Sequence, residues 1–111
     1  MLLEERRILV EIATQKLKEY LKQLYQDNLD KVILFGSEAR GEAEIDSDVD
    51  ILIVLKQPFI YFDEIKRVSE FISDLCLDYQ LYLSCCFATS QTWQKSETGF
   101  YRNLRAEGIE L

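Results

Sequence analysis

Two aspartates one residue apart, Asp48 and Asp50, lead directly into the aliphatic run Ile51–Leu55. Alternate residues of a β-strand point to the same face, roughly 7 Å apart along the backbone, so the two carboxylates would lie side by side. At about 6 Å and an effective dielectric constant near 20, their repulsion is on the order of 2–3 kcal/mol. A divalent cation would remove it, and carboxylates that hold Mg²⁺ beside nucleotide phosphates recur in phosphoryl and nucleotidyl transfer. The alternative is a solvated strand end without further function.

A second feature, Gly36-Ser37, directly follows the β-prone run Lys31–Phe35. A strand that turns sharply into a helix start presents backbone N–H groups and the positive end of the helix dipole. Glycine lets a ligand approach the backbone, so such a turn favours phosphate. The Ser37 hydroxyl would add a donor, and Arg40 on the same turn would add a cation. An ordinary strand-to-helix corner is the alternative explanation.

Acidic residues surround this turn. Glu38 and Glu42 would repel a bound phosphate if their side chains pointed inward, so we expect both in solvent. The loop Gly41–Ser47, which joins the turn to the aspartates, is polar and is expected to be exposed.

The elements that must position these residues follow from hydrophobic periodicity. Helical spacing and apolar β-prone runs alternate along the chain, and their order predicts a small mixed β-sheet with helices packed on it, an α/β (α+β) fold. At 111 residues we expect one domain spanning residues 1–111. The expected helices are residues 3–25, a turn at 38–40, 62–77, a short segment around Trp93, and 99–106; the expected strands are 31–35, 48–55 and 78–87.

Composition excludes several classes of function. The net charge of −7 disfavours direct binding to nucleic acid, which needs clustered Lys and Arg. The absence of histidine removes Ser-His and Cys-His catalysis. Three cysteines without C-x-x-C spacing suit small buried side chains in a reducing cytoplasm better than disulfides or zinc ligands. No apolar run is long enough to span a bilayer, so we expect no membrane partner.

The two features together form a recognisable pattern: Gly36-Ser37, ten intervening residues, then Asp48-Val49-Asp50. This pattern resembles the signature of the DNA polymerase β-like nucleotidyltransferase superfamily. It is most similar to the minimal nucleotidyltransferase (MNT) proteins, the antitoxins of HEPN/MNT toxin–antitoxin pairs. The similarity runs through Phe35–Gly41, through Ser47 and the strand after it, and into the tail Phe100–Ile109.

The resemblance implies a polymerase β-like nucleotidyltransferase fold and an activity. Members bind a nucleoside triphosphate with Mg²⁺ and transfer a nucleotidyl group, releasing pyrophosphate. By position, Gly36 and Ser37 would hold the triphosphate, with Arg40 beside them, and Asp48 and Asp50 would bind the metal. In the antitoxin branch the reaction is AMP transfer from ATP to a tyrosine hydroxyl of a partner HEPN toxin.

One departure from the family pattern concerns the third carboxylate that the superfamily usually supplies from a later strand. The expected acidic position falls on Gln80, which cannot ionise. Asp78 lies two residues earlier in the predicted strand 78–87 and would point to the same face. Asp78 therefore replaces the third metal ligand, or no third carboxylate exists.

The second case leads to an alternative function. The chain would then be a catalytically weak or inactive antitoxin that neutralises its toxin by stoichiometric binding. A third possibility, an enzyme that modifies a small substrate such as an aminoglycoside, is disfavoured because 111 residues leave little scaffold for a sugar pocket.

Overall fold

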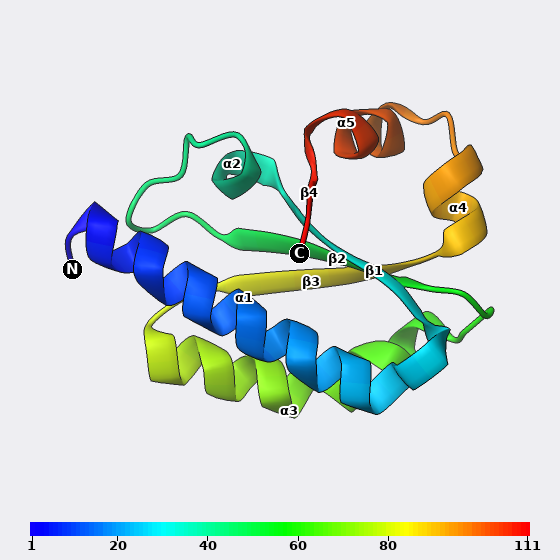
Figure 1. The fold of residues 1–111 in the computed structure, drawn as a ribbon, viewed down its shortest axis with the longest axis horizontal. Helices are drawn as coiled ribbons and strands as arrows, with labels where there is room; N and C mark the ends of the chain where they lie inside the picture. The colour runs from blue at the N-terminus through cyan, green and yellow to red at the C-terminus, as the bar shows by residue number, and fades with distance from the viewer.

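A four-stranded mixed β-sheet forms the middle layer of the molecule in the computed structural model, which describes all residues from 1 to 111 (Figure 1). The strand order is β3-β2-β1-β4. β1 is antiparallel to both β2 and β4, whereas β2 and β3 are parallel, so the prediction of a mixed sheet is confirmed. The strands are β1 (Leu29–Phe35), β2 (Val49–Leu55), β3 (Leu83–Thr89) and β4 (Ile109–Glu110).

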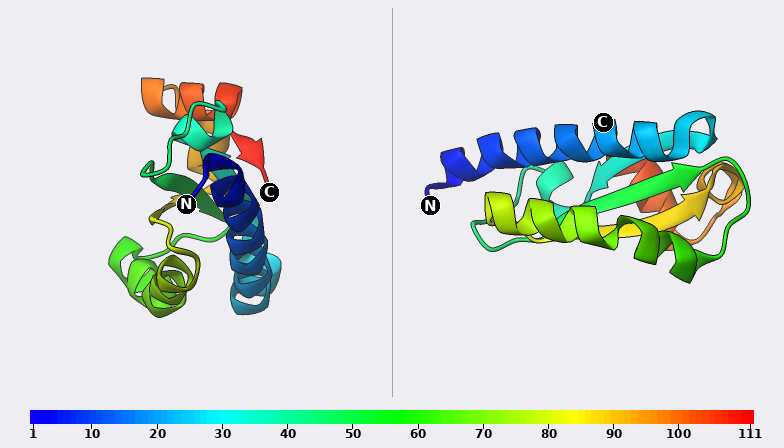
Figure 2. Two further views of the ribbon diagram at one scale, coloured as in Figure 1. Left: turned by 90° about the vertical axis from the view of Figure 1, so that its left-hand side faces the viewer. Right: turned by 90° about the horizontal axis from the view of Figure 1, so that it is seen from below.

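Helices cover both faces of this sheet. The two long helices, α1 and α3, lie side by side on one face, and α4 and α5 lie on the other (Figures 1 and 2). None of the helices is long and apolar enough to cross a membrane. The helices are α1 (Leu3–Tyr25), a 3₁₀ turn η1 (Gln26–Asn28), α2 (Gly36–Ala39), α3 (Tyr61–Tyr79), α4 (Ser90–Lys95) and α5 (Gly99–Glu107).

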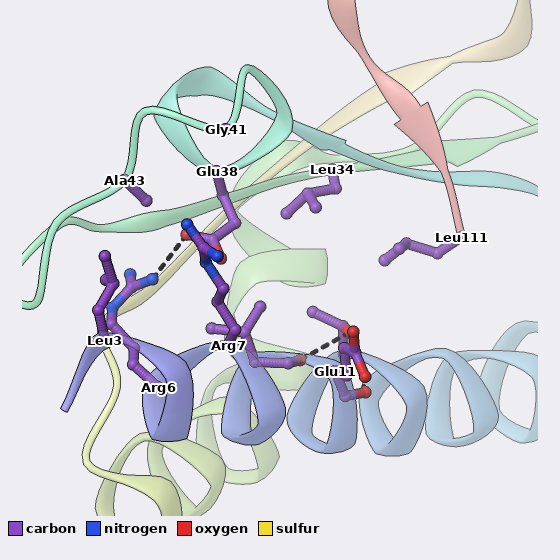
Figure 3. A pocket seen from close by; sticks show the side chains of 11 residues that line it. Leu3, Arg6, Arg7, Glu11, Leu34, Glu38, Gly41, Ala43 and Leu111 are labelled. Atoms are coloured by element: carbon purple, nitrogen blue, oxygen red, sulfur yellow. Dashed lines mark hydrogen bonds and ion pairs between the residues drawn. The ribbon is translucent and has the colours of Figure 1, made fainter. Parts of the chain in front are cut away.

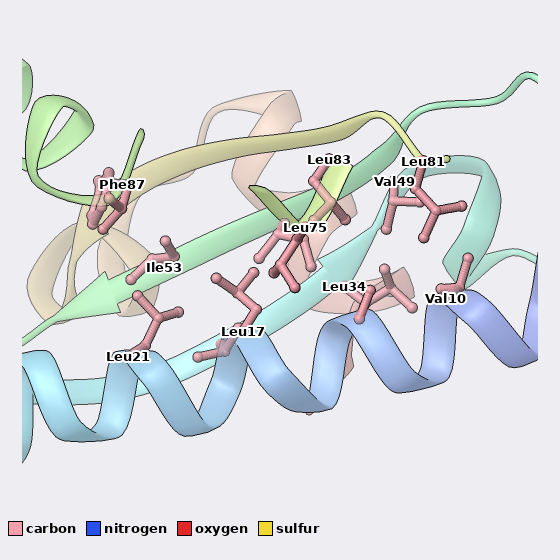
Figure 4. Packing of buried hydrophobic residues seen from close by; sticks show 14 of the residues in the cluster. Val10, Leu17, Leu21, Leu34, Val49, Ile53, Leu75, Leu81, Leu83 and Phe87 are labelled. Atoms are coloured by element: carbon pink, nitrogen blue, oxygen red, sulfur yellow. The ribbon is translucent and has the colours of Figure 1, made fainter. Parts of the chain in front are cut away.

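The central strand β2 separates the two hydrophobic clusters. Ile51 and Ile53 belong to the cluster under the helices α1 and α3, and Figure 4 shows Ile53 pointing into it, whereas Leu52 and Val54 face the layer that contains α5. All four side chains are fully buried, which is typical of a continuous apolar run in a strand covered on both faces. Because side chains alternate along a strand, Asp50 lies on the same face as Leu52, the α5 side of the sheet.

The prediction of a strand over residues 78–87 is wrong at its start. The helix α3 continues to Tyr79, and Gln80 ends it in the left-handed conformation, with φ +55°. The backbone N–H groups of Gln80 and Leu81 both donate to the carbonyl of Cys76, which closes the helix as in a Schellman motif. The helical stripe persists past Leu77 because Tyr79 still packs against the core, and β3 begins only at Leu83.

The shortest strand was not predicted from the sequence. Gly108 ends α5, and the next two residues pair with the free edge of β1. The Leu111 N–H donates to the Val32 carbonyl at 2.8 Å and extends this contact. Two residues are too few for a periodic pattern, so only the tertiary structure reveals β4.

Candidate active site

The glycine-serine turn and the aspartate pair meet at one end of the β1–β2 ladder. Phe35, the last residue of β1, pairs with Asp50 of β2, so Gly36 lies directly against the Asp50 side chain. A Cβ atom on Gly36 would overlap Oδ2 of Asp50, and Gly36 also has φ +73°. Contact and backbone conformation both require glycine here. The structure thus brings together two features that lie ten residues apart in the sequence.

Ser37 lies half-buried in the short helix α2, immediately after Gly36. The turn is closed by backbone bonds from Glu42 N–H to the Ser37 carbonyl at 2.9 Å and from Gly41 N–H to the Glu38 carbonyl at 3.2 Å. Gly41, with φ +73°, ends the helical turn where the sequence predicted. Ser37 is therefore held in a tight turn one residue from the carboxylate contact.

The carboxylate pair has an unbalanced charge. Asp48 is exposed and Asp50 half-buried, and neither forms an ion pair with a basic side chain. The pKa of Asp50 is raised first by burial and then by the charge of Asp48, while Arg40 opposes the shift. Mg²⁺ is commonly held by one or two carboxylates, with phosphates and water as its other ligands. The two carboxylates therefore fit a magnesium ion whose remaining ligands would be nucleotide phosphates and water.

Arg40 lies close enough to lower the pKa of Asp50, yet its guanidinium is partly occupied. Its Nε lies 3.2 Å from a carboxylate oxygen of Glu42, and one Nη lies 3.5 Å from a carboxylate oxygen of Glu107 on α5. The second Nη of Arg40 has no ion-pair partner and remains free to contact a phosphate. The Arg40–Glu107 pair borders a hollow of ≈ 180 Å³ that reaches Gly36 and is lined by Phe35, Gly36, Arg40, Phe100, Asn103, Leu104 and Glu107.

The prediction for the flanking glutamates is half correct. Glu42 is exposed as expected, but Glu38 is largely buried, because its carboxylate pairs with the guanidinium of Arg6 at 2.6 Å. Arg6 is a residue of this region that sequence reasoning missed. Its partner lies 32 residues away in the chain. Helical spacing offered a signal for its burial, because Arg6 lies four residues before Val10 and seven before Ala13, which are buried on the same face of α1.

The structure does not bring Asp78 to the aspartate pair. Asp78 lies near the end of helix α3, exposed, and its charge acts on Lys16 of α1. It therefore belongs to the layer on the opposite side of the sheet from Asp50. Gln80 is the cap of α3 and is also not part of a strand. Both residues were assigned to a strand because the start of β3 was predicted too early.

Ser84 is the true neighbour of Asp50 on β3. The parallel register pairs Asp50 with Ser84, so both side chains point to the α5 side of the sheet. No group of three or more His, Cys, Asp and Glu side chains is close enough to hold a metal ion together. The site therefore contains two carboxylates, with a hydroxyl on the adjacent strand.

The three cysteines agree with the prediction from composition. All are free and half-buried, and they pack against the two hydrophobic clusters. Burial raises the pKa of Cys85 to about 12 and that of Cys86 to about 11. Both thiols are therefore protonated at neutral pH and unreactive as nucleophiles.

One end of the mixed sheet holds a glycine-serine turn against two carboxylates, the arrangement that the resemblance to nucleotidyltransferases predicted. Comparison with known sequences agrees with this resemblance. The chain belongs to the Nucleotidyltransferase domain family, whose profile matches residues 14–106. The match includes the turn, both aspartates and most of α5.

Curated relatives come from Methanocaldococcus jannaschii. MJ0604 is 33% identical over 102 residues, which cover 91% of this chain and 96% of the relative. MJ0141 is 36% identical over 98 residues, which cover 87% of this chain and 93% of the relative. Both relatives carry the name of a proposed protein adenylyltransferase.

Solved structures share the fold at low sequence identity. A protein from Sulfolobus solfataricus, proposed to be a nucleotidyltransferase, superposes with a TM-score of 0.65 at 23% identity, covering 96% of this chain and 82% of that one. A toxin–antitoxin with AMP-PNP superposes with a TM-score of 0.59 at 16% identity, covering 88% and 70%. These similarities confirm the predicted fold class.

Proposed function

We propose that this chain, acting as one domain over residues 1–111, is a Mg²⁺-dependent adenylyltransferase and an antitoxin. It transfers AMP from ATP to a hydroxyl, that of a tyrosine, on a partner HEPN-type toxin. The observation that carries the proposal is the contact of Gly36 with Asp50, which joins the phosphate-binding turn to the carboxylates. The unpaired cysteines favour the reducing cytoplasm as its compartment.

The comparisons support the partner and the nucleotide. Two relatives carry names that propose protein adenylyltransferase activity. Two of the structural neighbours are toxin–antitoxin assemblies, and one of these two was solved with AMP-PNP. A protein acceptor also suits the small size of the hollow beside the site.

The roles of the residues follow from their placement. Asp48 and Asp50 would hold Mg²⁺, which, when bound, neutralises charge on the triphosphate as the transition state develops. Gly36 allows the phosphates to approach the backbone, and the Ser37 hydroxyl donates to a phosphate oxygen. Arg40 would contact the triphosphate through its second Nη, which has no ion-pair partner.

The reaction is a displacement at the α-phosphorus of ATP. The acceptor hydroxyl oxygen forms a bond to that phosphorus, and the bond to the oxygen bridging toward the β-phosphate breaks. Pyrophosphate leaves with the electron pair, and the acceptor proton passes to solvent. The turn and the carboxylates hold the triphosphate in line with the acceptor, which is the main contribution of protein groups to such reactions.

A second function, inhibition of the toxin by stoichiometric binding alone, is favoured by one observation. The residue that faces Asp50 from β3 is Ser84, so the site lacks a third carboxylate to bind metal or to activate the acceptor. If two carboxylates are insufficient for transfer, the chain neutralises its partner by contact only.

An intact-mass experiment separates the two functions. The chain is incubated with its proposed partner, a HEPN-type toxin, together with ATP and Mg²⁺, and the mass of both proteins is measured by mass spectrometry. Adenylyl transfer predicts mass increments of whole AMP groups on the partner, mapped to tyrosine by peptide sequencing. The increments should fall on the order of 100-fold or more with Asp48→Asn or Asp50→Asn. Absence of increments, with equal neutralisation by the wild type and Asp50→Asn, would support the binding function instead.

A further inference from the structure

The guanidinium of Arg6, on the first turns of α1, is almost completely buried, with 1% of its side chain exposed. Its Nη1 donates to Glu38 Oε2 at 2.6 Å, and its Nε and Nη2 donate to the carbonyls of Ile45 and Ser47 at 3.2 and 2.8 Å. A buried charge is tolerated only when it is paired and hydrogen-bonded. Figure 3 shows Arg6 and Glu38 facing each other beside a pocket of ≈ 270 Å³.

These three partners belong to both halves of the candidate active site. Glu38 directly follows Ser37 in the phosphate-binding turn, and Ser47 directly precedes Asp48. Between residues 43 and 47, hydrogen bonds to the rest of the chain come from Arg6 alone, because the remaining bonds join Glu44 to Ser47 within the loop. One side chain of α1 therefore sets where the loop lies relative to the turn.

The pairing also has an electrostatic consequence at the turn. The Glu38 carboxylate would repel a triphosphate bound at Ser37 if it pointed toward that residue. Arg6 draws the carboxylate toward α1, where its charge is balanced and its side chain is only 10% exposed. The turn can then receive an anion although an acidic residue is part of it.

We propose that Arg6 is a positioning residue, which holds the phosphate-binding turn and the loop before Asp48 in the geometry that binds Mg²⁺ and nucleotide. This inference rests on the proposed function for the identity of the ligand. The contact between Arg6 and the loop itself does not depend on that function. Arg6 touches neither the metal nor the phosphates; it acts through Glu38 and the carbonyls of the loop.

The test compares Arg6→Lys and Glu38→Gln with a matched control, Arg105→Lys. Arg105 also bonds two carbonyls, of Trp93 at 2.8 Å and Ser96 at 2.7 Å, but it fastens the connection between α4 and α5, away from the turn. Each variant is treated with an endoproteinase that cleaves after glutamate. Cleavage after Glu42 and Glu44 reports on the loop, and cleavage after Glu97 reports on the control connection.

The second measurement is the dissociation constant of Mg²⁺–AMP-PNP, by titration calorimetry. We expect Arg6→Lys and Glu38→Gln to accelerate cleavage in the loop several-fold and to weaken binding about 10- to 100-fold, as changes in the support of metal ligands commonly do. Arg105→Lys should accelerate cleavage after Glu97 and leave the dissociation constant within about twofold of the wild type.

Two results would overturn the proposal: unchanged loop cleavage in both site variants, or loosened loops with unchanged affinity. If Arg6→Lys unfolds, Glu38→Gln keeps the volume of the side chain and decides the question. A wild type that does not bind Mg²⁺–AMP-PNP contradicts the proposed function, whereas the cleavage pattern still tests the hold of Arg6 on the loop. The two failures are therefore distinguishable.

Discussion

The half-buried carboxylate of Asp50 lies against the backbone of Gly36, and its pKa is raised chiefly by burial and then by the charge of Asp48. A raised pKa means that the folded protein binds the proton more tightly than the unfolded chain does. The ionised form therefore destabilises the fold above the folded pKa, and this penalty disappears as the pH falls through that pKa. Without a cation, the site works against the stability of the protein.

We accordingly expect Asp50→Asn to stabilise the metal-free protein at pH 7, by up to about 1 kcal/mol for a partly solvated group. The gain should shrink as the pH is lowered below the folded pKa, because the wild-type carboxylate is then already neutral. Thermal denaturation at neutral and acidic pH measures it, with the exposed Asp46→Asn as control. A loss of stability at pH 7 would show that Asp50 is favourably placed even without metal.

Glycine 36 offers a second test, with a matched control in the same turn. Gly36 and Gly41 both have φ +73°, but only Gly36 has an atom in the way of a Cβ, Oδ2 of Asp50. Gly41→Ala should cost on the order of 1 kcal/mol through backbone strain, and Gly36→Ala should cost about 1–3 kcal/mol more because the carboxylate must move. Urea denaturation measures both, and equal losses would show that the Asp50 contact is unimportant.

Sequence reasoning located the residues whose chemical type and place in the chain indicate a role without knowledge of the fold. Gly36, Ser37, Asp48 and Asp50 stand out because each type has a specific use beside a strand end, and the structure brings them together. Arg6 was missed, although it lies four residues before Val10 and seven before Ala13 on the buried stripe of α1. That spacing indicates burial, but the partner Glu38 lies 32 residues away in the chain, and only the tertiary structure shows the contact.

At the scale of elements, the end of α3 and the start of β3 decide which residue faces the aspartates. Tyr, Leu and Cys suit a buried helix face and a strand about equally, so periodicity alone could not place the boundary. The tertiary structure continues the helix to Tyr79 and pairs Ser84 with Asp50. Strand β3 begins five residues later than predicted. Asp78, the predicted third ligand, therefore lies on helix α3, on the opposite side of the sheet from Asp50.

This register predicts the outcome of adding a carboxylate. Ser84→Asp should strengthen Mg²⁺ binding on the order of 10-fold, because a third carboxylate then points to the face of Asp50. Asp78→Asn should leave Mg²⁺ binding unchanged, since Asp78 lies in another layer. Calorimetric titration of each variant with Mg²⁺ and AMP-PNP provides the comparison. Weaker binding in Asp78→Asn, with no change in Ser84→Asp, would contradict the register.

Over the whole molecule, stability and function are divided between the two faces of the sheet. The cluster under α1 and α3 contains 16 buried residues, whereas the cluster under α5 contains 5, so most of the apolar burial lies away from the site. The layered fold could be predicted because it follows from hydrophobic periodicity. The edge strand β4 and the hydrogen bond from Arg6 of α1 to the active-site loop could not be predicted, because both form only when distant segments of the chain meet.

The central claim is that the turn at Gly36-Ser37 and the pair Asp48/Asp50 form one site for nucleotidyl transfer. The most direct measurement is to supply the chain and its partner with Mg²⁺ and ATP labelled on either the α- or the γ-phosphate. We predict label on the partner from α-labelled ATP alone, and its loss with Asp48→Asn. Label from γ-labelled ATP, or α-label that persists in Asp48→Asn, would contradict the claim.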